Sequence, residues 1–264
     1  MASAEVHEPV EPSQGWGVLH LFYDVDRDLA AAEPGGAKRF VEAVERLADD
    51  GHRVHTFPIL GTGADLGVMA YGPDLNRLQM FQEDLRAAPL EPAWSFVSLT
   101  ELSEYTSTED DERARLATEE SLSGDALEEK LTVWRDRMAH YNEHRLHPDL
   151  PNKKLLCFYP MNKRREQGAN WYELSFDERK QLMSGHAGVG RTYAGRVLQL
   201  ITGATGLDDW EWGVTLLADD PVALKEIVAE MRFDPVSARY ADFGPFYVGL
   251  MLDPAEAARR VGLT

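Results

Sequence analysis

The sequence predicts an α+β protein built from two ferredoxin-like halves. In the first half, segments follow one another in the order strand, helix, strand, strand, helix, strand, and the same order recurs in the second half. The segments LGVMAYGPDLNRLQMFQEDL, from Leu66, and WGVTLLADDPVALKEIVAEM, from Trp212, match in type: each has a strand, a turn with Asp and Pro, and an amphipathic helix. We interpret this match as the internal duplication of one unit.

In the first half, apolar runs indicate the strands and apolar residues at helical spacing indicate the helices. The first long helix follows a Pro-Gly break, which is typical of a helix start. The predicted elements are a strand at Gly17–Asp24, a helix at Gly36–Asp49, strands at His52–Leu60 and Leu66–Tyr71, a helix at Pro73–Arg86 and a strand at Trp94–Leu102.

The second half has the same pattern of apolar residues. The predicted elements are a strand at Leu155–Tyr159, a helix at Ser175–Gly185, strands at Thr192–Thr202 and Trp212–Leu217, a helix at Pro221–Met231 and a strand at Gly244–Leu252. A sheet that carries helices on one face leaves its other face apolar. Two such sheets packed face to face bury both faces or enclose a ligand between them.

These elements divide the chain into four parts. We expect a disordered lead at residues 1–14, a first ferredoxin-like domain at 15–106, a helical linker at 107–150 and a second ferredoxin-like domain at 151–264. The linker is highly charged, which is typical of a solvated helical segment. Thr108, followed by Glu109, Asp110 and Asp111, predicts a helix start because a threonine cap and early acidic residues suit a helix N-terminus.

Composition excludes several classes of protein. The 264 residues carry a net charge of -18 at an apolar fraction of 44%, so a full core is expected, whereas nucleic acid or an anionic membrane is not expected as the main partner. The single cysteine, Cys157, allows no disulfide within the chain and is expected to be a buried core thiol. The polar start and the lack of a long apolar run predict neither a secretory signal nor a membrane span, so we expect a cytoplasmic protein.

Most candidate functional residues lie between Cys157 and Arg191. Tyr159 ends a predicted strand and precedes a basic cluster in CFYPMNKRR, and His186 stands between small residues in LMSGHAGVGR. A neutral histidine ligates iron through one nitrogen while a carboxylate or carbonyl holds the other, and small neighbours admit a large planar ligand. By residue type its partner could be any of Glu173, Asp208, Asp209, Glu211 and Glu230.

Each of these residues also has an ordinary structural interpretation. A lone histidine is more often a capping or surface residue than a ligand. A tyrosine at the end of an apolar strand is usually part of the core or its rim. The cations Lys163, Arg164 and Arg165 usually form a solvated turn, although they also suit the carboxylates of a ligand. The nearby His52 and His55 lack the further ligands that would complete a metal site.

Three long blocks resemble the coproheme decarboxylases of the chlorite dismutase-like superfamily. They are CFYPMNKRR (157–165), MSGHAGVGRTYAGRVLQLITGATGLDDWEWGVTL (183–216) and EMRFDPVSARYADFGPFYVG (230–249). The resemblance implies a dimeric α+β barrel formed by the two halves of one chain, with haem bound in the second, and assembly as a homopentamer. It also implies transient contact with coproporphyrin ferrochelatase.

The resemblance assigns roles to single residues. It implies that His186 ligates iron, that Tyr159 forms a radical that attacks the propionate at position 2, and that Lys163 assists at the propionate at position 4. It matches Arg145 to a distal arginine. It implies four further pocket residues: Met161 and Gln199 on the distal side, and Trp210 and Ser237 near the propionates.

The activity that the resemblance implies is the decarboxylation of iron-coproporphyrin III (coproheme) to haem b, with hydrogen peroxide as the oxidant. Chlorite dismutases resemble this chain but carry an arginine where Gln199 stands, and they lack the reactive tyrosine. Some members use a distal histidine as a base. His140, His144 and His147 flank Arg145, and we select His144, with an exposed loop histidine as the alternative.

Two other functions remain open from the sequence. One is a chlorite dismutase or weak haem peroxidase. The other is a haem-binding carrier without catalysis, in which the acidic linker would be an interaction surface. Tyr159 and Lys163 argue against a carrier, since binding alone requires neither.

Overall fold

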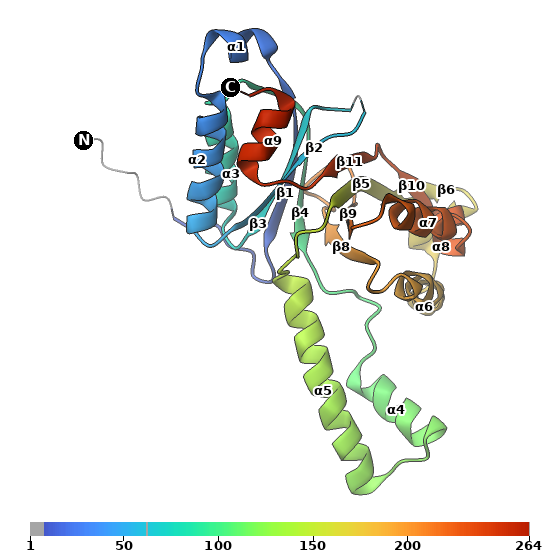
Figure 1. The fold of residues 1–264 in the computed structure, drawn as a ribbon. Coiled ribbons are helices and arrows are strands. Elements are labelled where there is room, and N and C mark those ends of the chain that lie inside the picture. The colour runs from blue at the N-terminus through green and yellow to red at the C-terminus, as the bar shows by residue number, and fades with distance from the viewer. Residues whose placement is uncertain (1–7, 62, 264) are drawn as a thin grey trace.

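The protein is a mixed α+β barrel with a helical arm. The computed structural model describes residues 8–61 and 63–263 (Figure 1). Within this part of the chain, no helix combines the length and the hydrophobicity needed to cross a membrane.

The first half forms an antiparallel sheet with the strand order β4-β1-β3-β2. Its first and third strands lie in the centre, as the ferredoxin-like expectation requires. The elements are β1 (Gly17–Val25), α1 (Arg27–Ala32), α2 (Gly36–Asp49), β2 (Arg53–Pro58), β3 (Leu66–Gly72), α3 (Leu75–Leu85) and β4 (Leu90–Thr100).

The second half repeats this arrangement with the strand order β11-β5-β9-β8. Its elements are β5 (Leu155–Lys163), β6 (Arg165–Glu166), β7 (Ala169–Asn170), η1 (Trp171–Glu173), α6 (Phe176–Thr192), β8 (Val197–Gly203), β9 (Trp212–Ala218), α7 (Pro221–Met231), α8 (Pro235–Tyr240), β10 (Ala241–Phe243) and β11 (Tyr247–Leu250). The C-terminal helix α9 (Pro254–Val261) returns to the first half and packs beside α2 (Figure 1).

The two sheets join at both edges and close into a barrel. On one side β4 pairs with β8 through Leu99 and Thr100. On the other side Thr56 in β2 bridges Leu252, and Ile59 bridges Gly249 in β11. Because each strand of the two four-stranded sheets then has neighbours on both edges over at least part of its length, few of their backbone groups are left unpaired.

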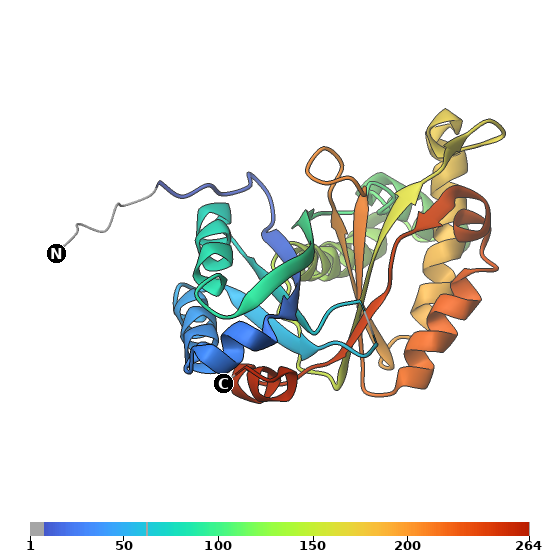
Figure 2. The ribbon, with the colours of Figure 1, turned by 90° about the horizontal axis from the view of Figure 1, so that it is seen from above.

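Helices cover the outer faces of the barrel, and aromatic side chains fill its interior. Figure 2 shows α2 and α3 on the outside of the first half and α6 and α7 side by side on the outside of the second. Inside, Phe158 packs among rings from both halves, with His20 stacked on it at a centroid distance of 3.9 Å. His20 Nε2 also hydrogen-bonds Thr215 Oγ1 at 2.9 Å, which joins the two halves.

Replacing Phe158 with Ala is expected to lower the free energy of unfolding by about 3–5 kcal/mol, the range for aromatic truncation in a packed core. The side chain is 0% exposed, so the surrounding rings cannot easily close the cavity. Urea unfolding measures the change. The matched control is Phe233→Ala, since Phe233 is 88% exposed, and there we expect less than about 0.5 kcal/mol. Equal effects would contradict the interior position of Phe158.

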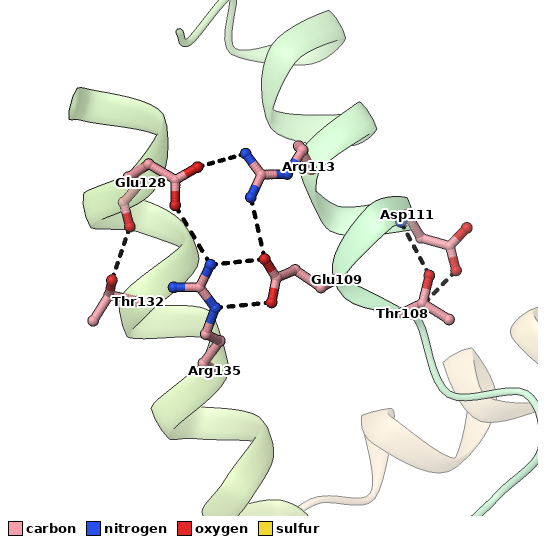
Figure 3. Close-up of polar contacts among 7 residues, drawn as sticks. All are labelled: Thr108, Glu109, Asp111, Arg113, Glu128, Thr132 and Arg135. Atoms are coloured by element: carbon pink, nitrogen blue, oxygen red, sulfur yellow. Dashed lines mark hydrogen bonds and ion pairs between the residues drawn. The ribbon is translucent and has the colours of Figure 1, made fainter. Parts of the chain in front are cut away.

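The linker is a two-helix arm that extends away from the barrel (Figure 1). It consists of α4 (Glu109–Glu119) and α5 (Gly124–Leu146), and Thr108 caps α4 as predicted, in a reciprocal capping box with Asp111. Each helix of the arm buries one leucine, Leu116 in α4 and Leu131 in α5, and most other residues of both helices are exposed or half-buried. Arg135 binds the Glu109 carboxylate through two nitrogens, at 2.7 and 2.8 Å, beside Arg113 and Glu128 (Figure 3).

Two elements run several residues past their predicted C-terminal ends. β5 runs past Tyr159 to Lys163, because Pro160 stands between the stretches of β5 that pair with β11 and β10, where its missing N–H breaks no ladder bond. α6 continues past Gly185 to Thr192, since a glycine inside a helix costs only about 1 kcal/mol and need not end it. His186 therefore lies within a helix.

The predicted disordered lead is only partly within the described residues. Residues 1–7 lie outside them. Val10 is held by the N-terminus of α3: its N–H donates to Asp74 Oδ1 at 2.9 Å and its carbonyl accepts from Leu75 N at 2.9 Å.

Candidate active site

The outer face of the second sheet brings several predicted site residues together. Because side chains alternate along a strand, Cys157, Tyr159, Met161 and Lys163 share one face of β5. Register with β9 and β8 places Gln199 on the same face, across Leu216 from Cys157. The expected buried thiol is confirmed: Cys157 is almost fully buried, which raises its pKa to about 12.

α6 covers this face without sealing it. The helix buries none of its residues, whereas α2 buries five against the first sheet. On this face Met161, Ile201 and Trp212 are half-buried, and Gln199, which lies next to Gly190 of α6, is exposed. A methyl group added at Gly185 would meet no atom within 4 Å. This accessible apolar face beside an imidazole suits a large planar ligand such as a porphyrin.

His186 is held by Asp234. Its Nδ1 lies 2.6 Å from Asp234 Oδ2, and since a carboxylate accepts, Nδ1 carries the hydrogen. The Nε2 lone pair is thereby left for a metal, the arrangement found for histidine ligands. Asp234 is not among the five carboxylates proposed from the sequence. It caps α8, accepts weakly from Ser237 N at 3.3 Å, and so links His186 to a second predicted site residue.

Lys163 is a buried cation without a carboxylate partner. Its Nζ lies 4.3 Å from the centroid of the Trp171 ring. Burial lowers its pKa to about 8, against the opposing effect of Asp234 and Glu211. The rest of the basic cluster is paired, Arg164 with Asp242 at 2.8 Å and Arg165 with Glu211. Among the described residues, no carboxylate forms an ion pair with Lys163 Nζ.

Tyr159 is almost fully buried on the same face of β5. Its ring stacks on Phe246 at a centroid distance of 4.4 Å, and burial raises the pKa of the phenol, which stays protonated at neutral pH. Within the described part of the chain, its hydroxyl makes no hydrogen bond. The phenolic hydrogen is therefore free to meet a ligand.

Arg145 reaches this face indirectly. From the last turn of α5, its Nε donates to the Glu101 carbonyl at 3.1 Å. The Glu101 carboxylate in turn accepts from Trp212 Nε1 at 3.3 Å. Of the three histidines around Arg145, His140 and His144 are exposed, and His147 hydrogen-bonds Glu143 at 2.8 Å.

Trp210 lies apart from the predicted site. It packs against the aromatic cluster inside the barrel and beside Gly244. Trp212 instead lies directly across from Met161 and shares its face. The alternation of Trp212 with Val214 and Leu216 along a predicted strand is the sequence signal that would have selected it.

A hollow in the first half is a separate feature. It lies between α3 and β4 and is lined mainly by apolar side chains, among them Leu19, Leu75, Leu78 and Val97. Asp208 is the one charged side chain in its lining, and its carboxylate accepts from Val97 N at 3.2 Å. Apart from Asp208, which was one of the five possible partners of His186, no predicted site residue is in its lining.

Comparison with known proteins places the chain in a family. The model of the family described as chlorite dismutase matches residues 35–252. The chain belongs to the chlorite dismutase family. A coproheme decarboxylase of Staphylococcus carnosus is 40% identical over 93% of this chain and 95% of its own length. A relative from Natronomonas pharaonis is 38% identical over 94% of this chain, which spans only 41% of that protein.

Solved structures of the family share the fold. A structure described as a novel heme-binding protein from Thermus thermophilus has a TM-score of 0.76 and 37% identity, over 97% of this chain and all of that one. A mutant chlorite dismutase from Candidatus Nitrospira defluvii has a TM-score of 0.70 at 17% identity, over 95% of this chain and 97% of that chain. At that identity the likeness shows the fold alone.

Proposed function

We propose that this protein is a coproheme decarboxylase, which converts iron-coproporphyrin III to haem b with hydrogen peroxide. The observation that carries the proposal is the face of β5 that the protonated Tyr159 shares with Lys163, together with a histidine on α6 that Asp234 holds. The similarity to the coproheme decarboxylase of Staphylococcus carnosus supports the proposal, because it covers nearly the full length of both chains.

The residues present fit an iron porphyrin. His186 Nε2 would ligate the iron, with Asp234 fixing the tautomer and orientation of the ring. Met161, Ile201 and Trp212 offer an apolar surface to the macrocycle. Iron-coproporphyrin III, oxidised by hydrogen peroxide, would itself supply the oxidising power for the reaction.

Tyr159 would carry the chemical step. It loses an electron and its phenolic proton, and the resulting tyrosyl oxygen takes a hydrogen atom from the β-carbon of a propionate. Loss of one further electron releases carbon dioxide and leaves a vinyl group. Each propionate thus gives up two electrons, which reduce one hydrogen peroxide to two waters. If Tyr159 attacks both propionates, the substrate must turn between the two steps.

Lys163 would hold a propionate by a charge-assisted hydrogen bond. Such a bond requires the ammonium form. Because the pKa of Lys163 in the ligand-free protein is about 8, affinity for iron-coproporphyrin III is expected to be full below pH 8 and to fall as the pH rises above it. Absorbance titrations from about pH 6.5 to 9.5 measure this. Lys163→Gln is the control: we expect about tenfold weaker binding at pH 7 and no such fall. A fall that persists in Lys163→Gln would contradict the assignment.

The wider organisation belongs to the same proposal. Residues 151–264 form the haem-binding domain, 15–106 its ferredoxin-like companion and 107–150 the linker between them. Gln199 and Ser237 would contact the porphyrin, and Arg145 would assist on the distal side. We propose assembly as a homopentamer in the cytoplasm, with transient contact to a coproporphyrin ferrochelatase.

The test compares three outcomes for protein loaded with iron-coproporphyrin III. Haem b extracted after the addition of peroxide supports decarboxylation. Sustained release of oxygen on addition of chlorite would instead indicate a chlorite dismutase. Tight binding without either reaction would indicate a carrier, the function closest to the description of the Thermus thermophilus structure.

A further inference from the structure

Glu211 is a buried carboxylate that binds three groups of the candidate site. Its Oε2 accepts from the Lys163 backbone N–H at 2.8 Å, and its Oε1 accepts from the Tyr172 phenol at 2.6 Å. Arg165 pairs with the same Oε1. Only 6% of the Glu211 side chain is exposed. A buried carboxylate is tolerated when its oxygens are satisfied in this way, and such a network keeps one geometry.

These bonds join three neighbouring segments of the chain to Glu211, which lies about forty residues further on. Lys163 ends β5, Arg165 lies in β6, Tyr172 lies in η1, and Glu211 directly precedes β9. Trp171 is the neighbour of Tyr172 in η1, and its ring lies under the Lys163 ammonium. Glu211 therefore fixes both the main chain from which the Lys163 side chain extends and the segment that carries the ring beside its Nζ.

We propose that Glu211 is a positioning residue that holds the Lys163 ammonium over Trp171, ready for a carboxylate of the ligand. The other charged group that acts on Lys163 is Asp234, which is engaged by His186. Arg165 neutralises Glu211, so Glu211 orders the lysine without occupying its ammonium. The inference rests on the proposed function only for the identity of the ligand carboxylate.

The first test uses the ligand-free protein. The acetylation rate of Lys163 is measured by peptide mass, relative to the exposed Lys225 in the same sample. In Glu211→Gln the relative rate is expected to rise about fivefold or more, because local opening exposes the amine. Glu166→Gln, which removes an exposed carboxylate from the same hairpin, is expected to leave the rate unchanged. An unchanged rate in Glu211→Gln would overturn the proposal.

A milder variant provides a second test in case Glu211→Gln does not fold. Tyr172→Phe leaves the carboxylate and removes only the phenol hydrogen bond. It is expected to raise the relative acetylation rate of Lys163 about twofold. If Glu211→Gln does not fold, Tyr172→Phe becomes the test. An unchanged acetylation rate of Lys163 in Tyr172→Phe would contradict the positioning role of Glu211.

The second test is a double-mutant cycle on iron-coproporphyrin III affinity. If Glu211 acts through Lys163, Glu211→Gln weakens binding alone but adds less than about twofold in a Lys163→Gln background. Independent, additive losses would show a general structural role. If Lys163→Gln alone bound iron-coproporphyrin III with normal affinity, Lys163 would not hold a propionate as the proposed function requires. The acetylation rates would still test whether Glu211 positions Lys163.

Discussion

Replacing Tyr159 with Phe is expected to leave iron-coproporphyrin III bound but unconverted. The ring keeps its stacking on Phe246 and loses only the hydroxyl, which makes no hydrogen bond within the described residues. Binding is therefore expected to change less than about threefold. The phenylalanine ring has no phenolic hydrogen to lose, so haem b formation is expected to fall at least about a thousandfold, or about 4 kcal/mol of barrier. Single-turnover assays with peroxide measure the rate.

The matched control for this change is Tyr23→Phe. Tyr23 is as buried as Tyr159 but packs in the first-half core beneath α2 and α3. Its loss of a hydroxyl is expected to leave conversion at the parental rate. If Tyr159→Phe also formed haem b at the parental rate, the radical role of Tyr159 would be wrong.

Replacing His186 with Ala is expected to separate binding of the iron from binding of the porphyrin. Because His186 is proposed to bind the iron and not the porphyrin ring, affinity for iron-coproporphyrin III is expected to fall about a hundredfold, whereas affinity for metal-free coproporphyrin III changes less than about threefold. Absorbance titrations measure both, and added imidazole is expected to restore the spectrum of the iron complex.

The control for the histidine is His144→Ala. His144 is exposed on α5, and its removal is expected to change neither titration. An equal loss of affinity for both porphyrins in His186→Ala would indicate that His186 supports the fold around the site rather than the iron.

The repeated pattern of strands and helices made most of the fold predictable. The helix at Gly36–Asp49 and the helix at Pro221–Met231 have the bounds that the sequence predicted, because a glycine or proline start and regular apolar spacing mark both. The end of α6 was not predictable from local signals, since its glycines resemble a helix stop. The return of α9 to the first half depends on contacts remote in sequence, which no local pattern encodes.

The candidate site was predictable in part for the same physical reason. Tyr159, Met161 and Lys163 share a face because strand alternation is a local property. Asp234 was missed because it lies far from His186 in sequence and meets it only through the packing of α8 against α6. Trp212 shares the face of Met161 because it is the first residue of β9, a position that the predicted strand already gave it.

The central claim is the peroxide-driven loss of two carboxyl groups. We would load the protein with iron-coproporphyrin III, add hydrogen peroxide in steps below one equivalent, and follow the porphyrin by mass. We expect two successive losses of one carboxyl group each, through an intermediate with one vinyl group, and completion after two equivalents. Bleaching of the bound porphyrin without loss of mass would contradict it.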